Sequence, residues 1–462
     1  MKPTAGYGSG GHGSDDATII DVLAEGLADL TYEDAPERVK AKVRDCLLHA
    51  WVVTAGAGET DHPDVVRRVI EEHLVSSGSA GSTVLLGVGR APASTAAWGN
   101  AVLAHARVQE DTHITVHPGV VVIPSALAAA QREGASGTGL LDAVLRGYST
   151  ATALSAVLNS RVTPPFRATG AFGPMAAAGA AASILGLDID GTRRALALAA
   201  STSGGTTESF DAGTQEWHFQ PGQAAQAGVI AADLARLGVP GSRYAFENSG
   251  GFLGAFAGGT RAGDRSAVED HLTSGLGILE VTFKPYPVCA FNQAPGAAAV
   301  ELSSRLDGRK IARVEVLMSS AEARYPGVDN AGRITTAEQA IMSVQCAVAS
   351  ALLDGNITFR RLRATNSPPM CALIPLIHVT ADESLPDKHA VVSVTLEDGD
   401  VLTCPSPDMN VDLRWGPEQV MANAVRMLPE TVLTQESLAH LDEAISALEG
   451  AESLDRLVRA LP

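Results

Sequence analysis

The chain has 462 residues, of which 45% are hydrophobic, 19% charged and only 4% aromatic, so we expect two domains with cores built from Ala, Val and Leu. Its 34 basic and 52 acidic residues give a formal net charge of -18, which argues against nucleic acid or an anionic membrane as a partner. The five cysteines lack the spacing of a metal site, and no run of residues is apolar and long enough to span a membrane, so we expect a cytoplasmic protein.

The N-terminal part of the sequence divides into a polar tail and a long helical region. Residues 1–16 are rich in Gly, Ser and Asp without periodicity, which predicts a flexible tail. From 17 to 270 apolar residues recur at helical spacing, as in PERVKAKVRDCLLHAWVVTAGA and SGTGLLDAVLRGYSTATALSAVL. These residues predict a large helical domain.

The pattern changes to short β-branched runs in residues 271–408. ARVEVLMSS, IPLIHVTAD and HAVVSVTLEDGDVLT predict a small sheet, and TTAEQAIMSVQCAVASALLDG predicts one helix that stops near Gly355. Residues 409–462 are again helical in pattern, and we expect them to return to the first domain. The second domain is therefore predicted to be α+β.

Several phrases, taken in their order along the chain, resemble the MmgE/PrpD family of 2-methylcitrate dehydratase and cis-aconitate decarboxylase. They are GNAVLAHARVQEDTHITVHPG, TGAFGPMAAAGAAASILGLD, PGQAAQAGVIAADLARLGVPG and TFKPYPVCAFNQ. The resemblance implies a mainly α fold, with a large all-helical domain, a smaller α+β lid and an active site in the cleft between them. It also implies a homodimer and a metal-independent enzyme that needs no cofactor.

Members of this family remove water or carbon dioxide from polycarboxylic acids, which requires general acid/base groups and cations that hold carboxylates. The residues expected to be catalytic are His117, Lys284, His218 and Asp111. The positions expected to bind substrate are Arg167, Thr112, His113, Trp217, Thr169 and Tyr325.

The histidines of this segment could also suggest a metal site. His113 and His117 are four residues apart with Asp111 nearby, but the segment does not have the pattern of a helix that would align them. We therefore expect no metal. Without the resemblance, His117 would more often be a loop histidine that bonds to the backbone.

The sequence departs from the family pattern at positions that carry its chemistry. Val108 stands where relatives have the first acidic residue of a His-Ala-Leu-Asp-Phe-Asp-Asp phrase, and the next acidic position is Glu110. Arg167 replaces a histidine, and because arginine does not titrate near neutral pH it is expected to bind an anion. Trp217 replaces a lysine.

Two further histidine positions correspond to Cys289 and Gln293. A pocket with fewer cations and more aromatic rings predicts a substrate that is less charged than citrate-like acids, with one carboxylate on Arg167. Such a substrate suggests a role in biosynthesis.

Three functions remain open from the sequence. The first is a lyase that dehydrates or decarboxylates a carboxylic acid. The second is an isomerase or cyclase on the same scaffold, which leaves the mass of its substrate unchanged. The third is an inactive binding homologue.

Overall fold

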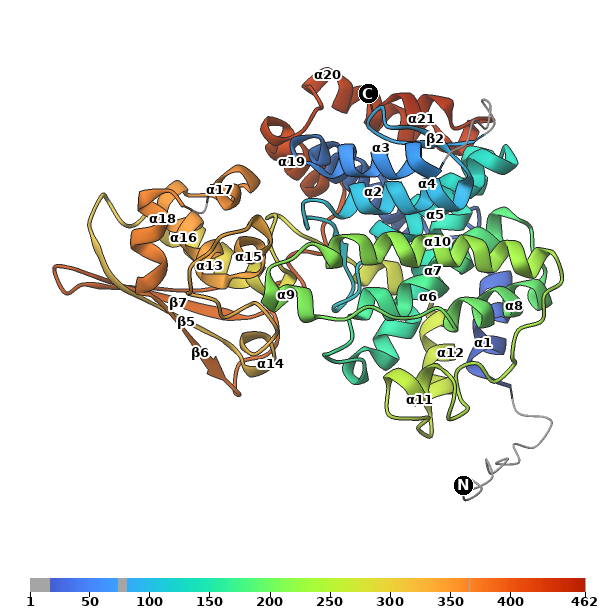
Figure 1. Ribbon diagram of the computed structural model, residues 1–462, viewed down its shortest axis with the longest axis horizontal. Coiled ribbons are helices and arrows are strands. Elements are labelled where there is room, and N and C mark those ends of the chain that lie inside the picture. Colours follow the sequence, from blue (N-terminus) through green and yellow to red (C-terminus); the bar gives the residue numbers. More distant parts are fainter. Residues whose placement is uncertain (1–16, 74–80, 365, 462) are drawn as a thin grey trace.

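The computed structural model describes residues 17–73, 81–364 and 366–461. The tail predicted for residues 1–16 lies outside these ranges. Figure 1 shows a large helical domain with a smaller α+β domain beside it, as the sequence predicts. No helix among the described residues is both long and apolar enough to cross a membrane.

The helical domain contains the long helices of the molecule and one short hairpin. Its helices are α1 (Ile19–Ala28), α2 (Glu37–Gly56), α3 (His62–His73), α4 (Ala93–His105), α5 (Gly119–Glu133), α6 (Gly137–Leu158), α7 (Ala168–Ile184), α8 (Ile189–Ala200), α9 (Glu208–Ala212), α10 (Glu216–Arg236), α11 (Phe252–Phe256) and α12 (Asp264–Ser274). The hairpin pairs β1 (Ser82–Val84) with β2 (Gly89–Ala91) in antiparallel register.

Local signals in the sequence explain where several of these helices begin and end. Thr18 and Asp21 form a capping box at the start of α1, and the Ser136 hydroxyl accepts from the backbone of Gly139 at the start of α6. Gly134 ends α5 with a φ of 65°, in the left-handed region that favours glycine. Small residues then allow α6, α7 and α10 to pack closely around a buried core.

The lid domain is built on a four-stranded sheet. Its strands are β5 (Ile311–Ser319), β6 (Ile377–Asp382), β7 (Ala390–Leu396) and β8 (Val401–Pro405). They lie in the order β6-β5-β7-β8, with β5 and β6 parallel and the other pairs antiparallel. These strands coincide with the predicted β-branched runs.

Helices pack beside this sheet and give the lid its own buried core. They are α13 (Gln293–Ser303), α14 (Ser320–Ala323), α15 (Ala337–Met342), α16 (Val344–Asp354), α17 (Phe359–Arg363) and α18 (Pro368–Leu373). The single helix expected across residues 335–355 is two helices, because the Ser343 hydroxyl accepts from the backbone of Cys346 and caps α16. Gly355 ends α16 with a φ of 65°.

The chain then leaves the lid for three C-terminal helices, α19 (Pro417–Met427), α20 (Gln435–Ser446) and α21 (Asp455–Arg459). Both α19 and α20 contact α2, so these helices lie on the helical domain (Figure 1).

A short antiparallel pair joins the two domains. β3 (Asp111–Thr112) pairs with β4 (Thr282–Phe283), so that Asp111 lies opposite Phe283 and Thr112 opposite Thr282. This pairing brings the loop after α4 against the start of the lid. The charged and polar residues on these two segments therefore meet at the domain boundary.

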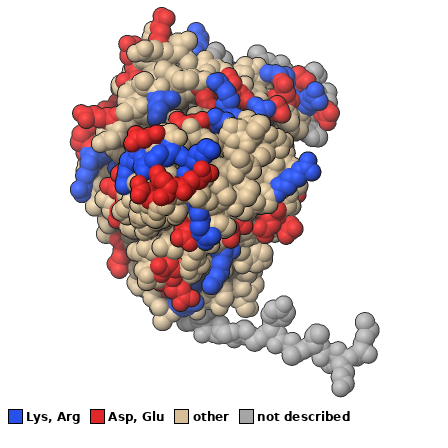
Figure 2. All heavy atoms as spheres, turned by 90° about the vertical axis from the view of Figure 1, so that its left-hand side faces the viewer, with Lys and Arg blue, Asp and Glu red and all other residues tan. Residues whose placement is uncertain are grey.

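Acidic and basic side chains are intermixed over the face that Figure 2 shows, which is the lid side of the molecule. A surface of mixed sign, with an acidic net charge of -18, creates no broad attraction for an anion. Recognition of an anion therefore depends on local groups of cations.

Candidate active site

Glu110 is the centre of a buried group of charged and polar side chains at the domain boundary. Its Oε1 accepts from Lys284 Nζ at 2.7 Å and lies 3.0 Å from His117 Nδ1. Its Oε2 lies 3.3 Å from His105 Nδ1. Burial alone would raise the pKa of Glu110, but the charge of Lys284 and the two neighbouring imidazoles hold it well below its usual range. Glu110, Lys284, His105, His117 and Arg167 are called the Glu110 cluster below.

The protonation of His105 follows from its contact with Arg167. Arg167 donates from one guanidinium nitrogen to His105 Nε2 at 2.8 Å. Since a guanidinium has only donors, His105 Nε2 must accept, and we assign the ring hydrogen to Nδ1, which faces Glu110. Burial lowers the pKa of His105 to about 4, so the ring is neutral at neutral pH.

The same argument applies to His117, which the sequence predicts to be catalytic. Its Nδ1 lies between two acceptors, Glu110 Oε1 at 3.0 Å and the carbonyl oxygen of Asp111 at 3.3 Å. We therefore assign the hydrogen to Nδ1, which leaves a lone pair on Nε2. Burial and the charge of Lys284 hold the pKa of His117 well below its ordinary value, so this lone pair is free to accept a proton.

Arg167 lies immediately before α7 and belongs to the cluster, as the sequence predicts for a site residue. Its guanidinium also donates to the carbonyl oxygen of Trp217 at 2.6 Å and lies over the rings of Phe210 and Trp217. The residue is 4% exposed. Protein acceptors therefore already engage both terminal nitrogens of this cation.

His218 and Trp217 lie beside the cluster, on the first turn of α10. The two rings stack with centroids 3.8 Å apart. His218 also lies 5.7 Å from the ring of His105 and 4.6 Å from the ring of His62. The four imidazoles of His62, His218, His105 and His117 thus form a row that ends at Glu110.

Asp111 is buried next to Glu110 in the chain, but its carboxylate faces another direction. It accepts from the Tyr148 hydroxyl and, at 2.9 Å, from the backbone of Gly119 at the start of α5. Burial raises the pKa of Asp111 to about 6, against these hydrogen bonds. This geometry favours a role in holding the loop, whereas the sequence predicts a catalytic role.

The two threonines predicted to bind substrate also make contacts within the protein. The Thr112 hydroxyl pairs with the Thr282 hydroxyl at 2.8 Å across the β3–β4 pair. The Thr169 hydroxyl accepts from the backbone nitrogen of His117 at 3.1 Å. Thr169 therefore fixes the loop that carries His117.

His113 and Tyr325 lie on opposite sides of the boundary. His113 is apart from the Glu110 cluster, with Nδ1 2.6 Å from the Ser155 hydroxyl and Nε2 3.4 Å from Glu280 Oε2. Tyr325 is a lid residue whose ring meets Phe291 edge-on at 4.8 Å. Burial raises the pKa of Tyr325 above its ordinary value, and the charge of Arg167 opposes this shift.

The positions that depart from the family pattern make the boundary more apolar. Val108 has a φ of 55° and packs in the lid core with Trp217 and Cys289. Burial raises the pKa of Cys289 to about 11, so its thiol is neutral. Gln293 donates to the carbonyl oxygens of Tyr286 and Val288 at 3.0 Å each, which is a structural role.

Sequence reasoning did not select Glu110 or His105 as site residues, although the structure makes them the core of the cluster. The signal was present, because both lie in the HARVQEDT phrase that carries the resemblance. His105 is 62 positions from Arg167 along the chain, and Glu110 is 174 positions from Lys284. Spacing along the chain does not reveal such pairs.

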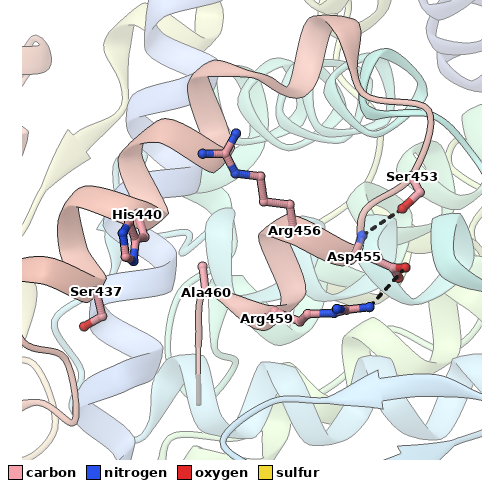
Figure 3. Close-up of a pocket in the computed structure, with 7 residues that line it drawn as sticks. All are labelled: Ser437, His440, Ser453, Asp455, Arg456, Arg459 and Ala460. Atoms are coloured by element: carbon pink, nitrogen blue, oxygen red, sulfur yellow. Dashed lines mark hydrogen bonds and ion pairs between the residues drawn. The ribbon is translucent and has the colours of Figure 1, made fainter.

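A separate hollow lies among the C-terminal helices, lined by residues of α20 and α21 (Figure 3). There Arg459 pairs with Asp455, and the Asp455 backbone donates to the Ser453 hydroxyl. These are exposed surface contacts that share no residue with the Glu110 cluster. The described residues hold no group of His, Cys, Asp and Glu side chains arranged as a metal site.

The helical domain, the α+β lid and the buried acid/base cluster between them define a two-domain enzyme. Family models match both parts, the MmgE/PrpD N-terminal domain over residues 21–264 and the MmgE/PrpD C-terminal domain over residues 286–409. The chain belongs to the MmgE/PrpD family and is a lyase of its dehydratase and decarboxylase class.

Two curated relatives agree with this assignment. The chain is 29% identical over 396 residues to cis-aconitate decarboxylase of Mus musculus, covering 80% of this chain and 79% of the relative. It is 28% identical over 397 residues to cis-aconitate decarboxylase of Homo sapiens, with 80% of each chain covered.

Proposed function

We propose that this lyase removes water or carbon dioxide from a carboxylic acid by metal-independent acid/base catalysis, with neutral His117 as the proton-transfer group. The proposal rests on the contact between Glu110 Oε1 and His117 Nδ1, which are 3.0 Å apart. A carboxylate that orients an imidazole in this way fixes its tautomer and stabilises the imidazolium that forms when Nε2 takes a proton.

Both reactions of the class use this arrangement. In a dehydration, His117 Nε2 takes the proton from the carbon beside the substrate carboxylate. The electron pair left behind forms a carbon–carbon double bond, and the leaving hydroxyl group takes the proton from the imidazolium and departs as water. In a decarboxylation, the bond to carbon dioxide breaks, and the electron pair left on the carbon takes up a proton that His117 Nε2 has first accepted from solvent. The proton moves at the same nitrogen in each case.

The substrate is less charged than cis-aconitate, the acid named for the two relatives. Glu110 already neutralises Lys284 at 2.7 Å, and Arg167 already donates to His105 and Trp217. Trp217, Phe210 and Phe291 add apolar surface at the boundary. A single carboxylate with an apolar remainder fits these groups better than three carboxylates do.

The test is mass spectrometry of the purified protein with acids that range from cis-aconitate and 2-methylcitrate to monocarboxylates with apolar tails. We expect one acid to lose about 18 or 44 mass units, the masses of water or carbon dioxide. His117→Gln is expected to lower the rate about 100-fold or more, the usual contribution of a positioned acid/base group.

His440→Gln is the matched control, because His440 is an exposed histidine of α20 and its replacement should leave the rate unchanged. Equal rates for the His117→Gln variant and the unaltered protein would refute the role of His117. An acid that takes up deuterium from heavy water but loses neither water nor carbon dioxide would point to an isomerase or cyclase that uses the same base. Binding of an acid without either change would indicate an inactive binding homologue.

A further inference from the structure

A second polar pocket lies at the domain boundary, beside the Glu110 cluster, and has a volume of about 240 Å³. Its lining comes from the loop after β3, from the segment around β4, from the lid and from the residues that precede α19. The lid contributes Lys388 and Glu322, and the last segment contributes Arg414. This site is called the Lys388–Arg414 pocket below.

Among the residues that the structure describes, neither cation of this pocket has an ion-pair partner. Neither the Lys388 ammonium nor the Arg414 guanidinium forms an ion pair or a side-chain hydrogen bond with any of residues 17–73, 81–364 or 366–461. Burial lowers the pKa of Lys388, and the charge of Glu322 opposes that shift. Lys388 is half-buried and Arg414 is exposed at the pocket mouth, so both can donate charge-assisted hydrogen bonds to an anion that enters the pocket.

The acidic residues of the pocket, in contrast, already have protein donors. Glu280 Oε2 lies 3.4 Å from His113 Nε2, and Asp387 Oδ1 accepts from the Ser319 hydroxyl at 2.6 Å. Glu322 Oε1 accepts from the backbone nitrogen of Lys388 at 2.9 Å. The groups of this pocket that still need hydrogen-bond partners are therefore the cations Lys388 and Arg414, which need acceptors.

Glu322 itself adds a donor to the pocket. The residue is 2% exposed, and its Oε2 has no hydrogen-bond partner among the described residues. Burial raises the pKa of Glu322 to about 8, so at neutral pH the carboxyl group is protonated and can donate. Its bond to the backbone also holds Lys388 at a φ of 62°, which is uncommon for a residue with a side chain.

The pocket adjoins the cluster through two contacts. Thr282 lines the pocket, and its hydroxyl pairs at 2.8 Å with that of Thr112, which follows Glu110 by two residues. Phe291 also lines the pocket, and its ring meets that of Tyr325 at 4.8 Å. Thr282 and Phe291 thus connect the lining of the pocket to Thr112 and Tyr325, which lie near the cluster.

We propose that the Lys388–Arg414 pocket binds a small organic carboxylate, with Lys388, Arg414 and the Glu322 carboxyl group as donors, and that acid substrates pass through it on their way to the Glu110 cluster. Binding of a carboxylate stands on the pocket alone. Passage of substrate rests on the proposed function.

The binding test is isothermal titration calorimetry of the full chain at neutral pH with tricarballylate, a saturated tricarboxylate that has no hydroxyl group or double bond. We expect measurable binding to the unaltered protein and at least tenfold weaker binding to Lys388→Met and to Arg414→Gln, since each removes a charge-assisted bond. Arg414→Lys keeps the charge and is expected to recover part of the affinity. Should Lys388→Met fail to fold, the Arg414 variants carry the test.

Lys310→Met is the matched control. Its ammonium is a lid cation with a side chain 80% exposed and 4.0 Å from Glu397 Oε2, so its loss should leave binding unchanged. Equal affinity of the Arg414→Gln variant and the unaltered protein, or no heat of binding at millimolar tricarballylate, would overturn the carboxylate site.

Steady-state kinetics distinguish a failure of the carboxylate pocket from a failure of the proposed function. Once an acid substrate is found, Arg414→Gln is expected to raise its KM with little change in kcat, because the variant leaves the Glu110 cluster intact. An unchanged KM would overturn the passage of substrate. Tricarballylate binding that depends on Arg414, in a protein that transforms no acid, would support the pocket and count against the proposed function of the Glu110 cluster.

Discussion

Glu110 determines the character of the site more than any other residue. Lys284 is 1% exposed and would be a strong binding partner for a substrate carboxylate, but Glu110 already pairs with it at 2.7 Å. A buried pair of this kind offsets its desolvation only with good geometry and further hydrogen bonds. The imidazoles of His117 and His105 lie 3.0 and 3.3 Å from the two carboxylate oxygens, but Oε2 makes no hydrogen bond with the described residues, so one acceptor of the cluster is left open.

Protonation of buried histidines makes the free energy of unfolding depend on pH, and His49 is the clearest case. Its Nε2 donates to the carbonyl oxygen of Gln109 at 2.9 Å, and burial lowers its pKa to about 4. In the unfolded chain the pKa is about 6.5, so as the pH falls below that value the unfolded state binds the proton first. The stability that neutral His49 provides is complete above about pH 6.5 and is lost as the pH falls towards 4.

His49→Gln keeps a donor for the carbonyl oxygen but cannot titrate. Between pH 7 and pH 5 we expect the unaltered protein to lose about 2 kcal/mol more free energy of unfolding than the variant, measured by urea denaturation. Asp45 and Asp111, whose raised pKa values act in the opposite direction, are present in both proteins and cancel. Identical pH dependence in the two proteins would contradict the assignment of a neutral buried His49.

The sequence indicates several residues of the candidate site but not the contacts that these residues make. His117, Arg167 and Lys284 were selected from the sequence and meet in the Glu110 cluster. The direction of the Asp111 carboxylate could not be foreseen, because it depends on Tyr148 of α6 and on the start of α5. Such directions arise from tertiary packing that no local pattern encodes.

At the scale of elements, the position of the site depends on how closely α7 and α10 approach. Arg167 immediately precedes α7, and Trp217 and His218 lie in the first turn of α10. At Gly228 of α10, an added Cβ would lie 2.3 Å from the Ala177 Cβ and 2.6 Å from the backbone nitrogen of Ala178. Those atoms belong to α7 and cannot turn away as the end of a flexible side chain can.

Gly228→Ala is therefore expected to push α7 and α10 apart and to destabilise the protein by about 1–3 kcal/mol, as overpacking of a core does. Thermal or urea unfolding measures the loss. Gly139→Ala in α6 is the control, because the nearest atom to its added Cβ is 3.5 Å away, and alanine there should be neutral or slightly stabilising. A Gly228→Ala variant as stable as Gly139→Ala would show that the two helices separate at little cost.

The elements themselves were largely predictable, since periodicity and glycine stops mark them. The four strands of the lid and helices such as α2 and α6 follow their apolar patterns. The sequence does not predict the division of residues 335–355 at Ser343, because a serine within a helical pattern usually lies on the exposed side of one helix. Here the Ser343 hydroxyl caps a second helix. The order β6-β5-β7-β8 has no local signal.

For the whole molecule, the lid closes over the site through contacts that join it to α9 and α10. Gln215 donates to Glu338 Oε1 at 3.0 Å, and the Thr336 hydroxyl donates to the carbonyl oxygen of Gly213 at 3.0 Å. Asp211 Oδ1 accepts from the backbone of Gly327 at 2.6 Å. Since the Glu110 cluster is buried beneath these contacts, a substrate that reaches it must displace side chains or move the lid.

The assembly of the chain into a homodimer remains a prediction, and the outer face of α10 offers a surface for it. Ile230 and Leu234 lie one turn apart on one side of α10, and Leu237 is the residue at its C-terminal cap; they are 43%, 37% and 79% exposed. Ile189 of the neighbouring helix α8 is 38% exposed. Exposed apolar side chains on neighbouring helices are typical of an interface.

Light scattering coupled to size-exclusion chromatography tests this prediction. We expect the unaltered protein to elute as a dimer and the double variant Leu234→Glu, Leu237→Glu to elute as a folded monomer, because two carboxylates would have to be buried at the interface. Val401→Glu is the control, since Val401 is 59% exposed on the lid strand β8 and should leave the mass unchanged. A dimer that survives the double substitution would place the interface elsewhere, and a monomeric unaltered protein would refute the dimer itself.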